Sequence, residues 1–191
     1  MMRVITGSAK GMRLDTLPGN NTRPTSERAK EAIFSYLQFG IEGRAVLDLY
    51  AGSGQLGIEA LSRGAESAVF VDSERSAAEI IKRNLDKTRV SDRASVICSD
   101  VHSVIGRLKS GFDIIFIDPP YALRAVPEVL ELALKSNIFK PNTIVICESE
   151  EEDIFCTKIK LREYFDVRKV SKYAAAHVTV LGMKQNLLCE K

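Results

Sequence analysis

The sequence has few of the side chains from which metal sites and disulfide frameworks are built. Only two histidines occur among its 191 residues, so a metal site has little to build on and none is expected. The four cysteines are far apart in the chain, and their spacing fits neither a disulfide framework nor a metal-binding pattern. This usage favours a reducing compartment such as the cytoplasm. The four are Cys98, Cys147, Cys156 and Cys189.

Long apolar runs are also absent. No run approaches the roughly 18 residues that a membrane-spanning helix requires, and residues 1–14 lack the apolar centre of a signal peptide. A cytoplasmic protein with no membrane partner is therefore expected. Apolar residues make up 45% of the chain and charged residues 27%, which is typical of a globular protein with a substantial core.

The net charge is small, but it is unevenly distributed. Residues 1–30 contain six basic and two acidic residues, an excess of +4, so the rest of the +2 chain sums to −2. A basic arm on a near-neutral body favours a polyanionic partner, although a solvated, poorly structured terminus explains the charge equally well. We divide the chain into a basic extension over residues 1–40, expected to pack on the core, and a main domain over residues 41–191.

From residue 45 onward, short apolar runs alternate with amphipathic segments. The runs are rich in Val and Ile, which favours strands covered on both faces, and the alternation predicts a parallel, doubly wound α/β sheet of the Rossmann type. The last two strands are close in sequence, so we expect an antiparallel hairpin at the edge of a seven-stranded sheet. Strands are predicted at 45–50, 67–72, 94–100, 112–118, 143–148, 164–173 and 177–183, helices at 54–63, 74–88, 101–109 and 124–137, and a solvated acidic loop at 148–153.

The first predicted strand runs into a glycine-rich loop, "DLYAGSGQLG". Gly52, Gly54 and Gly57 satisfy the G-x-G-x-x-G spacing between a strand and a helix, and Asp72 follows Gly52 by twenty residues. Glycine lets a ligand approach the backbone, the helix N-terminus offers free N–H groups, and Asp72 can accept hydrogen bonds from ribose hydroxyls. This pattern fits both a dinucleotide and S-adenosylmethionine.

Asp48 favours S-adenosylmethionine. It lies four residues before Gly52, where a carboxylate suits the ammonium group of a methionine moiety and suits a pyrophosphate poorly. The segment also resembles the D-x-[FY]-x-G-[ST]-G signature of class I methyltransferases, although Asp48 could instead be a helix-capping or turn acid. Asp100, at the end of the third strand, is expected to face the adenine edge, to cap the following helix, or both. The predicted cofactor-binding residues are Asp48, Tyr50, Gly52, Ser53, Gly54, Asp72, Ser73, Asp100 and Val101.

A second motif, "FDIIFIDPPY", ends the fourth strand. Asp118 is expected beside the first strand and therefore facing the methyl donor. Proline fixes φ and has no N–H, so an amine on a base could donate one hydrogen bond to the Asp118 carboxylate and one to the Pro119 carbonyl. Tyr121 would stack on that base, which must be flipped out or unpaired. Asp118, Pro119 and Tyr121 are thus the predicted catalytic residues; the alternative is that Pro119-Pro120 merely ends a strand.

The pattern [DN]-P-P-[YF] resembles that of amino-methyltransferases acting on adenine, cytosine or guanine. Residues 2–14 and 22–37 further resemble the opening of the RsmD-type 16S rRNA guanine-N2 methyltransferases, with R-P-T-x-[DE]-[RK]-x-[RK]-E-x-[IL]-F falling on residues 23–34. The resemblance implies methyl transfer from S-adenosylmethionine to a guanine N2 of 16S rRNA, within the small ribosomal subunit or its assembly intermediate. Arg23, Thr25, Arg28 and Glu31 match the family motif, and Arg23 is expected to contact RNA or the cofactor. The basic arm is expected to bind RNA, and the predicted substrate-binding residues are Lys10, Arg13, Arg23, Thr25, Arg28 and Pro120.

The chain departs from this family's pattern in one place. Tyr173-Ala174 stands where such proteins commonly have Tyr-Gly, which leaves the geometry of the last turn in question. Arg28 is also expected to pair with Glu31 at helical spacing. Three other functions remain open: a nicotinamide-dependent oxidoreductase, a DNA or RNA adenine-N6 amino-methyltransferase, and a non-catalytic RNA-binding domain.

Overall fold

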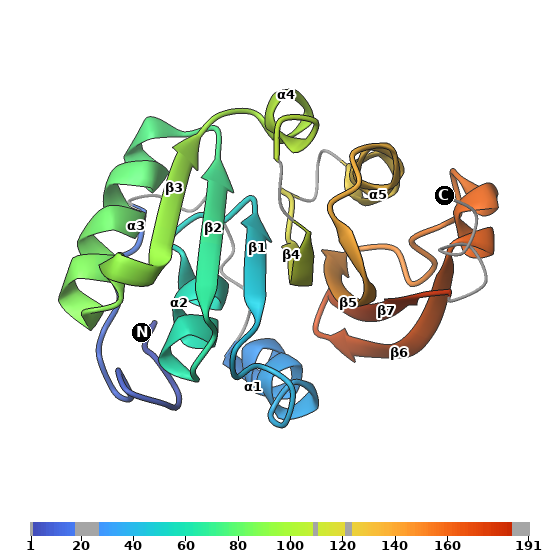
Figure 1. The fold of residues 1–191 in the computed structure, drawn as a ribbon. Coiled ribbons are helices and arrows are strands. Elements are labelled where there is room, and N and C mark those ends of the chain that lie inside the picture. The colour runs from blue at the N-terminus through green and yellow to red at the C-terminus, as the bar shows by residue number, and fades with distance from the viewer. Residues whose placement is uncertain (1, 18–26, 109–110, 121–123, 185–191) are drawn as a thin grey trace.

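The computed structural model describes residues 2–17, 27–108, 111–120 and 124–184 (Figure 1). Arg23, Thr25 and Tyr121 lie outside these ranges. The helices are α1 (Glu27–Tyr36), α2 (Gln55–Ser62), α3 (Arg75–Thr88), α4 (Val101–Ile105) and α5 (Val126–Lys135), with short 3-10 helices η1 (Ser91–Arg93) and η3 (Ile159–Glu163). The strands are β1 (Ala45–Leu49), β2 (Ser67–Asp72), β3 (Ala94–Cys98), β4 (Phe112–Ile117), β5 (Phe139–Ser149), β6 (Phe165–Tyr173) and β7 (Ala176–Met183).

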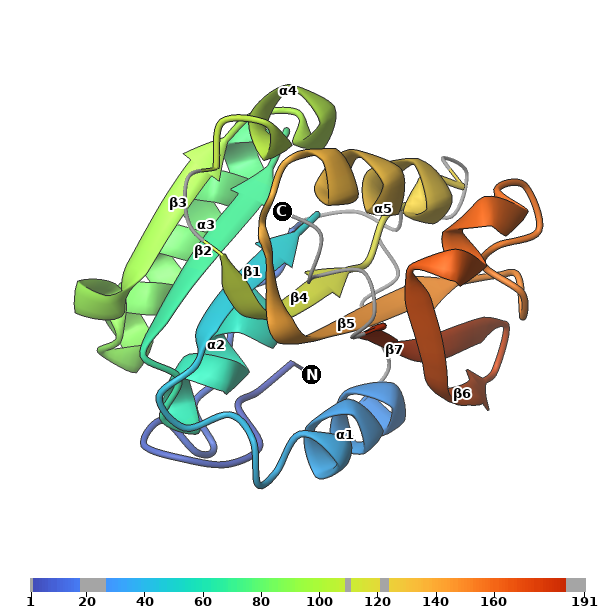
Figure 2. The same cartoon turned by 45° about the vertical axis from the view of Figure 1, so that its right-hand side comes forward.

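The seven strands form one sheet in the order β3-β2-β1-β4-β5-β7-β6. Strands β1 to β5 pair in parallel, and β7 pairs antiparallel with both β5 and β6, so the last two strands form the expected hairpin at one edge (Figure 2). The strand order reverses between β1 and β4. In sheets of this kind ligands bind beyond the carboxyl ends of the strands at that point. The predicted doubly wound architecture is confirmed.

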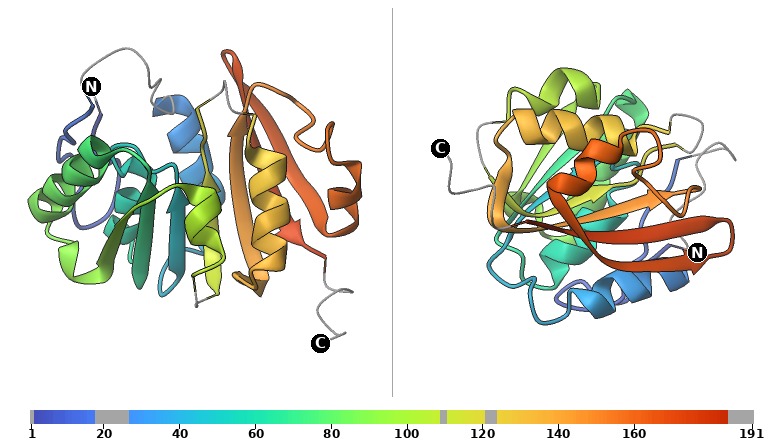
Figure 3. Two further views of the ribbon diagram at one scale, coloured as in Figure 1. Left: turned by 90° about the horizontal axis from the view of Figure 1, so that it is seen from above. Right: turned by 90° about the vertical axis from the view of Figure 1, so that its right-hand side faces the viewer.

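Helices cover both faces of the sheet (Figure 3). Alternate residues of β4 enter two apolar clusters: Ile114 and Phe116 pack on the side of α1, α2 and α3, and Ile115 and Ile117 on the side of α4 and α5. Because both faces are buried, the strand needs apolar side chains at consecutive positions rather than at every second one. In the described parts of the chain, no helix has the length and apolar content to cross a bilayer.

Several element ends differ from the predictions. The helix expected over 101–109 ends at Ile105, with Gly106 as its C-terminal cap. The strand expected over 143–148 begins at Phe139, because Phe139 pairs with Phe112 before a register shift, and it runs on to Ser149. The acidic segment predicted as a solvated loop therefore starts inside the sheet: Glu148 and Ser149 are buried, and only the residues after them lie in a loop.

The last turn of the chain keeps a left-handed residue although it lacks the glycine expected there. Tyr173 pairs with Ala176 across the β6–β7 hairpin, and Ala174 has φ 56°. A positive φ at only the first of the two central residues is the pattern of a type II′ turn, which prefers glycine at that place. The turn geometry is thus retained with an alanine in a conformation that disfavours a Cβ.

We expect Ala174→Gly to stabilise the protein by up to about 1 kcal/mol. Relief of the left-handed alanine contributes roughly 1–2 kcal/mol, and the added freedom of the unfolded chain offsets roughly 0.4–1 kcal/mol of this gain. Urea denaturation measures the difference. Ala175→Gly, one residue further and without a positive φ, is the matched control and should destabilise; equal losses in both variants would contradict the strain assigned to Ala174.

Candidate active site

The glycine-rich loop joins β1 to α2 at the carboxyl edge of the sheet, as predicted. Gly54 is the N-terminal cap of α2 with φ 78°, a conformation that L-residues with a side chain rarely adopt. At Gly57, a Cβ would lie 2.3 Å from the Phe70 ring on β2, so glycine allows the helix to pack directly on the sheet. The loop backbone therefore stays close to the strand ends and open to a ligand.

Asp48 is buried on β1 and contacts the start of α2. Its side chain is only 2% exposed, and its Oδ2 accepts a hydrogen bond from the Gly57 N–H at 2.9 Å. Burial raises the pKa of this carboxyl well above its usual range, the Gly57 bond opposes the rise, and the charges of Asp118 and Asp72 add to it. The helix-capping alternative is thus present in the structure. It leaves the second oxygen of Asp48 with unused acceptor capacity.

Asp72 lies at the tip of β2 and organises the same loop. Its Oδ2 accepts from the Gly52 N–H at 2.7 Å, and its Oδ1 accepts from the Glu74 N–H at 2.9 Å. The neighbouring Ser73 is exposed. Ser53 is buried, with its Oγ donating to the Met2 sulfur at 3.0 Å. Met2, at the start of the arm, is therefore bonded to Ser53 within the loop that is predicted to hold the cofactor.

Asp100 and Val101 begin α4 on the other side of this edge. The Asp100 Oδ1 accepts from the Ser103 N–H at 3.1 Å, so the capping interpretation is confirmed, while the contact with adenine stays a prediction. Tyr50 has φ 62°, and its hydroxyl is buried with no hydrogen-bond partner in the described part of the chain. Burial, together with the charges of Asp100 and Glu128, raises the pKa of Tyr50 to about 12, so the phenol stays protonated.

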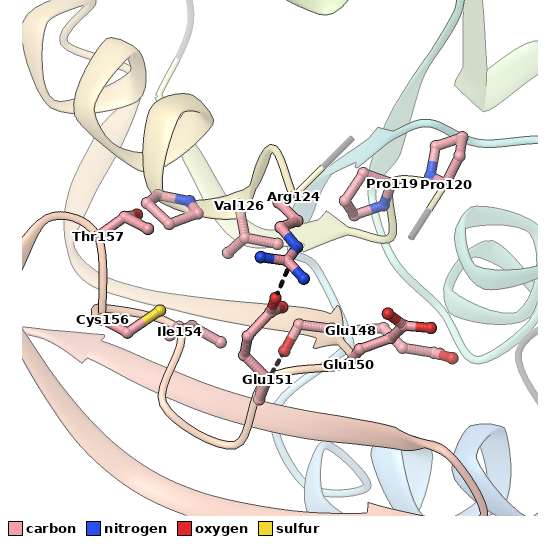
Figure 4. Close-up of a pocket in the computed structure, with 12 residues that line it drawn as sticks. Pro119, Pro120, Arg124, Val126, Glu148, Glu150, Glu151, Ile154, Cys156 and Thr157 are labelled. Carbon is pink, nitrogen blue, oxygen red and sulfur yellow. Dashed lines mark hydrogen bonds and ion pairs between the residues drawn. The ribbon is translucent and has the colours of Figure 1, made fainter. Parts of the chain in front are cut away.

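Asp118 follows β4 directly, between the ends of β1 and β5. Pro119 is buried and Pro120 is exposed, and both line a pocket beside the carboxyl end of β5 (Figure 4). The wall opposite the prolines comes from the start of α5 and the loop after β5, including Ile154 and Cys156. Arg124 Nε and Glu151 Oε1 form an ion pair of 3.1 Å at this pocket. The Asp-Pro-Pro segment thus lies between the cofactor loop and a second cavity.

Sequence reasoning missed the contribution of β5 to this pocket. Glu148 and Ser149 line it, although Glu148 was predicted only as the last residue of the strand over 143–148 and the first of the acidic loop, and Ser149 as part of that loop. Glu148 is 6% exposed. A signal was present, because Glu148, like Asp118, is an acid that ends an apolar run, "TIVICE".

The N-terminal arm is bound to α2 through Glu59. This carboxylate is completely buried and accepts from the Ile5 and Thr6 N–H groups at 2.7 and 2.9 Å. It also pairs with Lys30 Nζ at 3.0 Å and Arg63 Nε at 2.9 Å. Burial lowers the pKa of Lys30, and the Glu59 charge opposes that shift. The arm and α1 are thereby fixed to α2, the helix that follows the glycine loop.

The predicted substrate-binding residues are not brought together in one place. Lys10 and Arg13 are exposed on the arm, and Lys10 lines a shallow depression with Glu27 and Glu31 rather than the pocket at Pro119. Arg28 is exposed on α1. The expected ion pair between Arg28 and Glu31 is wrong: both residues are described, and no ion pair joins them. Both side chains project into solvent, where such pairs contribute little.

The acidic strand ends indicate the charge of the ligand. Asp48, Asp72 and Asp118 are close enough for their charges to interact, because the last two raise the pKa of the first. A pyrophosphate would add negative charge to this group, whereas a sulfonium with an ammonium group would be attracted to it. These acidic side chains fit S-adenosylmethionine and disfavour a nicotinamide dinucleotide, while the contacts of Asp48 with the ammonium and of Asp72 with the ribose stay predictions.

Comparisons with known proteins agree with this geometry. The model of the family described as "Conserved hypothetical protein 95" matches residues 2–181. The chain is 38% identical over 154 residues to the "Putative rRNA methyltransferase YlbH" of Bacillus subtilis, covering 79% of this chain and 84% of that protein. It is 31% identical to the "Ribosomal RNA small subunit methyltransferase D" of Escherichia coli, covering 80% and 76%.

Solved structures show the same architecture. The "Putative methyltransferase yhhF" of Escherichia coli superposes with a TM-score of 0.83 at 26% identity, over 96% of this chain and 98% of that one. SMU.776, a putative methyltransferase crystallised with S-adenosylhomocysteine, matches in fold alone, with a TM-score of 0.65 at 13% identity over 80% of this chain and 48% of its own. With its family match, its seven-stranded sheet and its acidic strand ends, the chain belongs to the RsmD family of class I S-adenosylmethionine-dependent methyltransferases.

Proposed function

We propose that the chain transfers a methyl group from S-adenosylmethionine to the exocyclic N2 amine of a guanine in 16S rRNA. The observation that carries this proposal is the position of Asp118-Pro119-Pro120, between the cofactor loop of β1 and the pocket beside β5. Relatives named as small-subunit rRNA methyltransferases support the choice of RNA. The alternative is methylation of adenine N6 in RNA or DNA, since the Asp-Pro-Pro-Tyr pattern alone does not distinguish the bases.

The chemistry requires orientation more than acid–base strength. The cofactor supplies an electrophilic methyl group on a sulfonium. Asp118 and the Pro119 carbonyl hold the hydrogens of the amine, so that its lone pair, otherwise delocalised into the ring, is directed at this methyl group. Orientation of this kind lowers a barrier by about 7–11 kcal/mol. No strong base is needed, because the nitrogen becomes acidic as it acquires the methyl; Asp118 or water takes the proton. Tyr121 stacks on the base.

The N-terminal extension, residues 1–40, supplies RNA affinity in this proposal. Lys10, Arg13 and Arg28 are exposed cations, as binding to phosphate requires, and Arg23 and Thr25 belong to the motif of the same extension. Through Glu59 and Ser53 the arm contacts the helix and the loop that carry the cofactor site. Met2 is the part of the arm that reaches the loop, whereas the turn that carries Lys10 packs at Ser62, the other end of α2. An rRNA bound to the arm therefore extends along α2 to reach the catalytic edge. The substrate is the small ribosomal subunit or its assembly intermediate.

The product identifies the function directly. Small-subunit particles and naked 16S rRNA, both from cells lacking the enzyme, are incubated with the protein and labelled S-adenosylmethionine, and the nucleosides are separated by mass spectrometry. We expect N2-methylguanosine. N6-methyladenosine would favour the alternative base, and absence of any methylated nucleoside from both RNA forms would overturn the proposal. Comparison of the two forms shows which one is the substrate.

Asp72→Ala should weaken S-adenosylmethionine binding by about 1.5–3 kcal/mol, the contribution of a hydrogen bond to a charged group. The carboxylate is expected to bind the ribose, and it also positions the loop through the Gly52 N–H. Isothermal titration calorimetry measures the loss, with thermal melting in parallel. Glu74→Ala, at the exposed neighbouring acid, is the matched control and should bind normally. Unchanged affinity in the Asp72→Ala protein would exclude this placement of the ribose.

A further inference from the structure

The carboxyl ends of β4 and β5 place two acids next to each other. Ile117 and Cys147 are paired in the parallel register, so the residues that follow them, Asp118 and Glu148, stand at neighbouring strand ends. Adjacent strands are about 4.8 Å apart. Asp118 is the predicted acceptor for the target amine, whereas Glu148 has no role in the mechanism given above. Glu148 nevertheless lines the pocket next to Pro119 and Pro120 and is almost fully buried.

We propose that Glu148 reads the target base: its carboxylate accepts the N1–H of guanine while the adjacent N2 amine lies at Asp118. The proposal rests on the proposed function and adds a specificity-determining residue to it. On the Watson–Crick edge of guanine, the N1–H donor is the direct neighbour of the N2 amine, so two acceptors side by side match two donors side by side. An ionised carboxylate only accepts hydrogen bonds.

The same carboxylate selects against adenine. The ring nitrogen next to the adenine N6 amine is N1, which carries a lone pair in place of a hydrogen. With its amine at Asp118, adenine would present this acceptor to the acceptor Glu148. A site that hydrogen-bonds one base rejects an analogue that leaves a buried polar group without a partner. Glu148 thus explains how an Asp-Pro-Pro-Tyr motif common to several amino-methyltransferases becomes specific for guanine.

Besides Glu148, the pocket has apolar walls and a cation that suit the remaining parts of a guanine base. Apolar walls come from Val126 and Ile154, and Arg124 lies at the same pocket, 74% exposed in its side chain and paired through Nε with Glu151. Figure 4 shows Glu148 below Pro119, with the Arg124–Glu151 pair beside them, and all of these residues line the same pocket. A guanidinium has five N–H donors, so Arg124 retains donors of the kind that the guanine O6 accepts.

A base analogue separates this role from a structural one. Small-subunit RNA is prepared with the target guanine replaced by 2-aminopurine, which keeps the N2 amine but has a lone pair at N1 and no O6. The change in the rate ratio on substitution of Glu148 therefore reports the N1 contact, since the loss of O6 is common to both proteins. The wild-type protein should methylate guanine roughly 10- to 100-fold faster than 2-aminopurine, the effect of a hydrogen bond to a charged group. In Glu148→Gln, the amide can donate to that lone pair, so the ratio of the two rates should fall at least about 10-fold. Glu152→Gln, an exposed acid outside the pocket, is the control.

The rate ratio distinguishes base recognition by Glu148 from a structural role. A merely structural Glu148 would change melting and both rates together and leave their ratio unaltered, which would overturn the inference. If Glu148→Gln does not fold, Glu148→Asp takes its place in the same comparison, and equal wild-type rates on guanine and 2-aminopurine contradict recognition of N1–H. If the wild-type protein does not methylate guanine at all, the proposed function itself has failed.

Discussion

Asp118→Ala is expected to lower the single-turnover rate of methylation by roughly 100-fold or more, the scale of one hydrogen bond that acts in a transition state. The substitution removes one of the two acceptors that orient the amine, and this interaction tightens as the nitrogen changes geometry. Such losses appear in kcat rather than in ground-state binding. Asp118→Asn should be milder, because the amide keeps one oxygen. The assay uses small-subunit particles with enzyme in excess.

Cofactor affinity and stability serve as internal controls for this variant. Asp118 lies just beyond the carboxyl end of the central strand β4 and is half-exposed. It contributes little apolar packing, so the melting temperature should barely fall. S-adenosylmethionine binding should also stay close to that of the wild type. Asp92→Ala, at an exposed acid in η1, should retain full activity. An Asp118→Ala protein that is folded, binds cofactor and methylates at the normal rate would remove the mechanism proposed for the motif.

Glu59→Ala should destabilise the protein by about 3–5 kcal/mol, the usual cost of removing one partner of a buried ion pair. The carboxylate is fully buried, so its removal leaves the Lys30 ammonium, itself 3% exposed, without its main counter-charge. The amides of Ile5 and Thr6 lose their acceptor as well. Urea denaturation gives the loss in the free energy of unfolding.

Hydrogen exchange locates the effect. In Glu59→Ala the Ile5 and Thr6 amides should exchange faster than those of β1 and β4, because the arm detaches before the sheet opens. Arg75→Ala, which removes the exposed Arg75–Glu79 pair, is the control and should cost less than about 1 kcal/mol. A Glu59→Ala protein as stable as this control would show that the arm is held by its apolar contacts instead.

The cofactor loop could be predicted because its determinants are local. Gly54 and Gly57 reflect a left-handed cap and a close helix–sheet contact, and both requirements act within one strand–loop–helix unit. The same holds for β4, where four consecutive buried apolar residues, from Ile114 to Ile117, lead directly to Asp118. Roles that depend on a ligand, such as that of Asp72 toward ribose, stay predictions.

Errors arose where a distant segment decides the local structure. Strand β5 starts at Phe139 because Phe112 of β4 offers it a partner, although "FKPN" has little strand character of its own. Glu148 is buried because β5 lies between β4 and β7, whereas the acidic letters around it favour a solvated loop. Arg28 and Glu31 have the spacing of a helical ion pair, but in solvent this spacing alone does not bring the side chains together.

By itself the sequence determined the parallel α/β class, the glycine loop with Asp48, and the acid that ends β4. These features follow from the side-chain periodicity of strands, from glycine's backbone freedom and from the polarity of strand ends, which act over a few residues. Only the tertiary structure decided that Glu148 stands beside Asp118, that Glu59 holds the arm, and that a pocket opens next to Pro119. Each of these features depends on which segments the packed sheet and helices bring into contact. Those contacts are set by the burial of apolar surface and the pairing of buried polar groups over the whole chain, not by a few neighbouring residues.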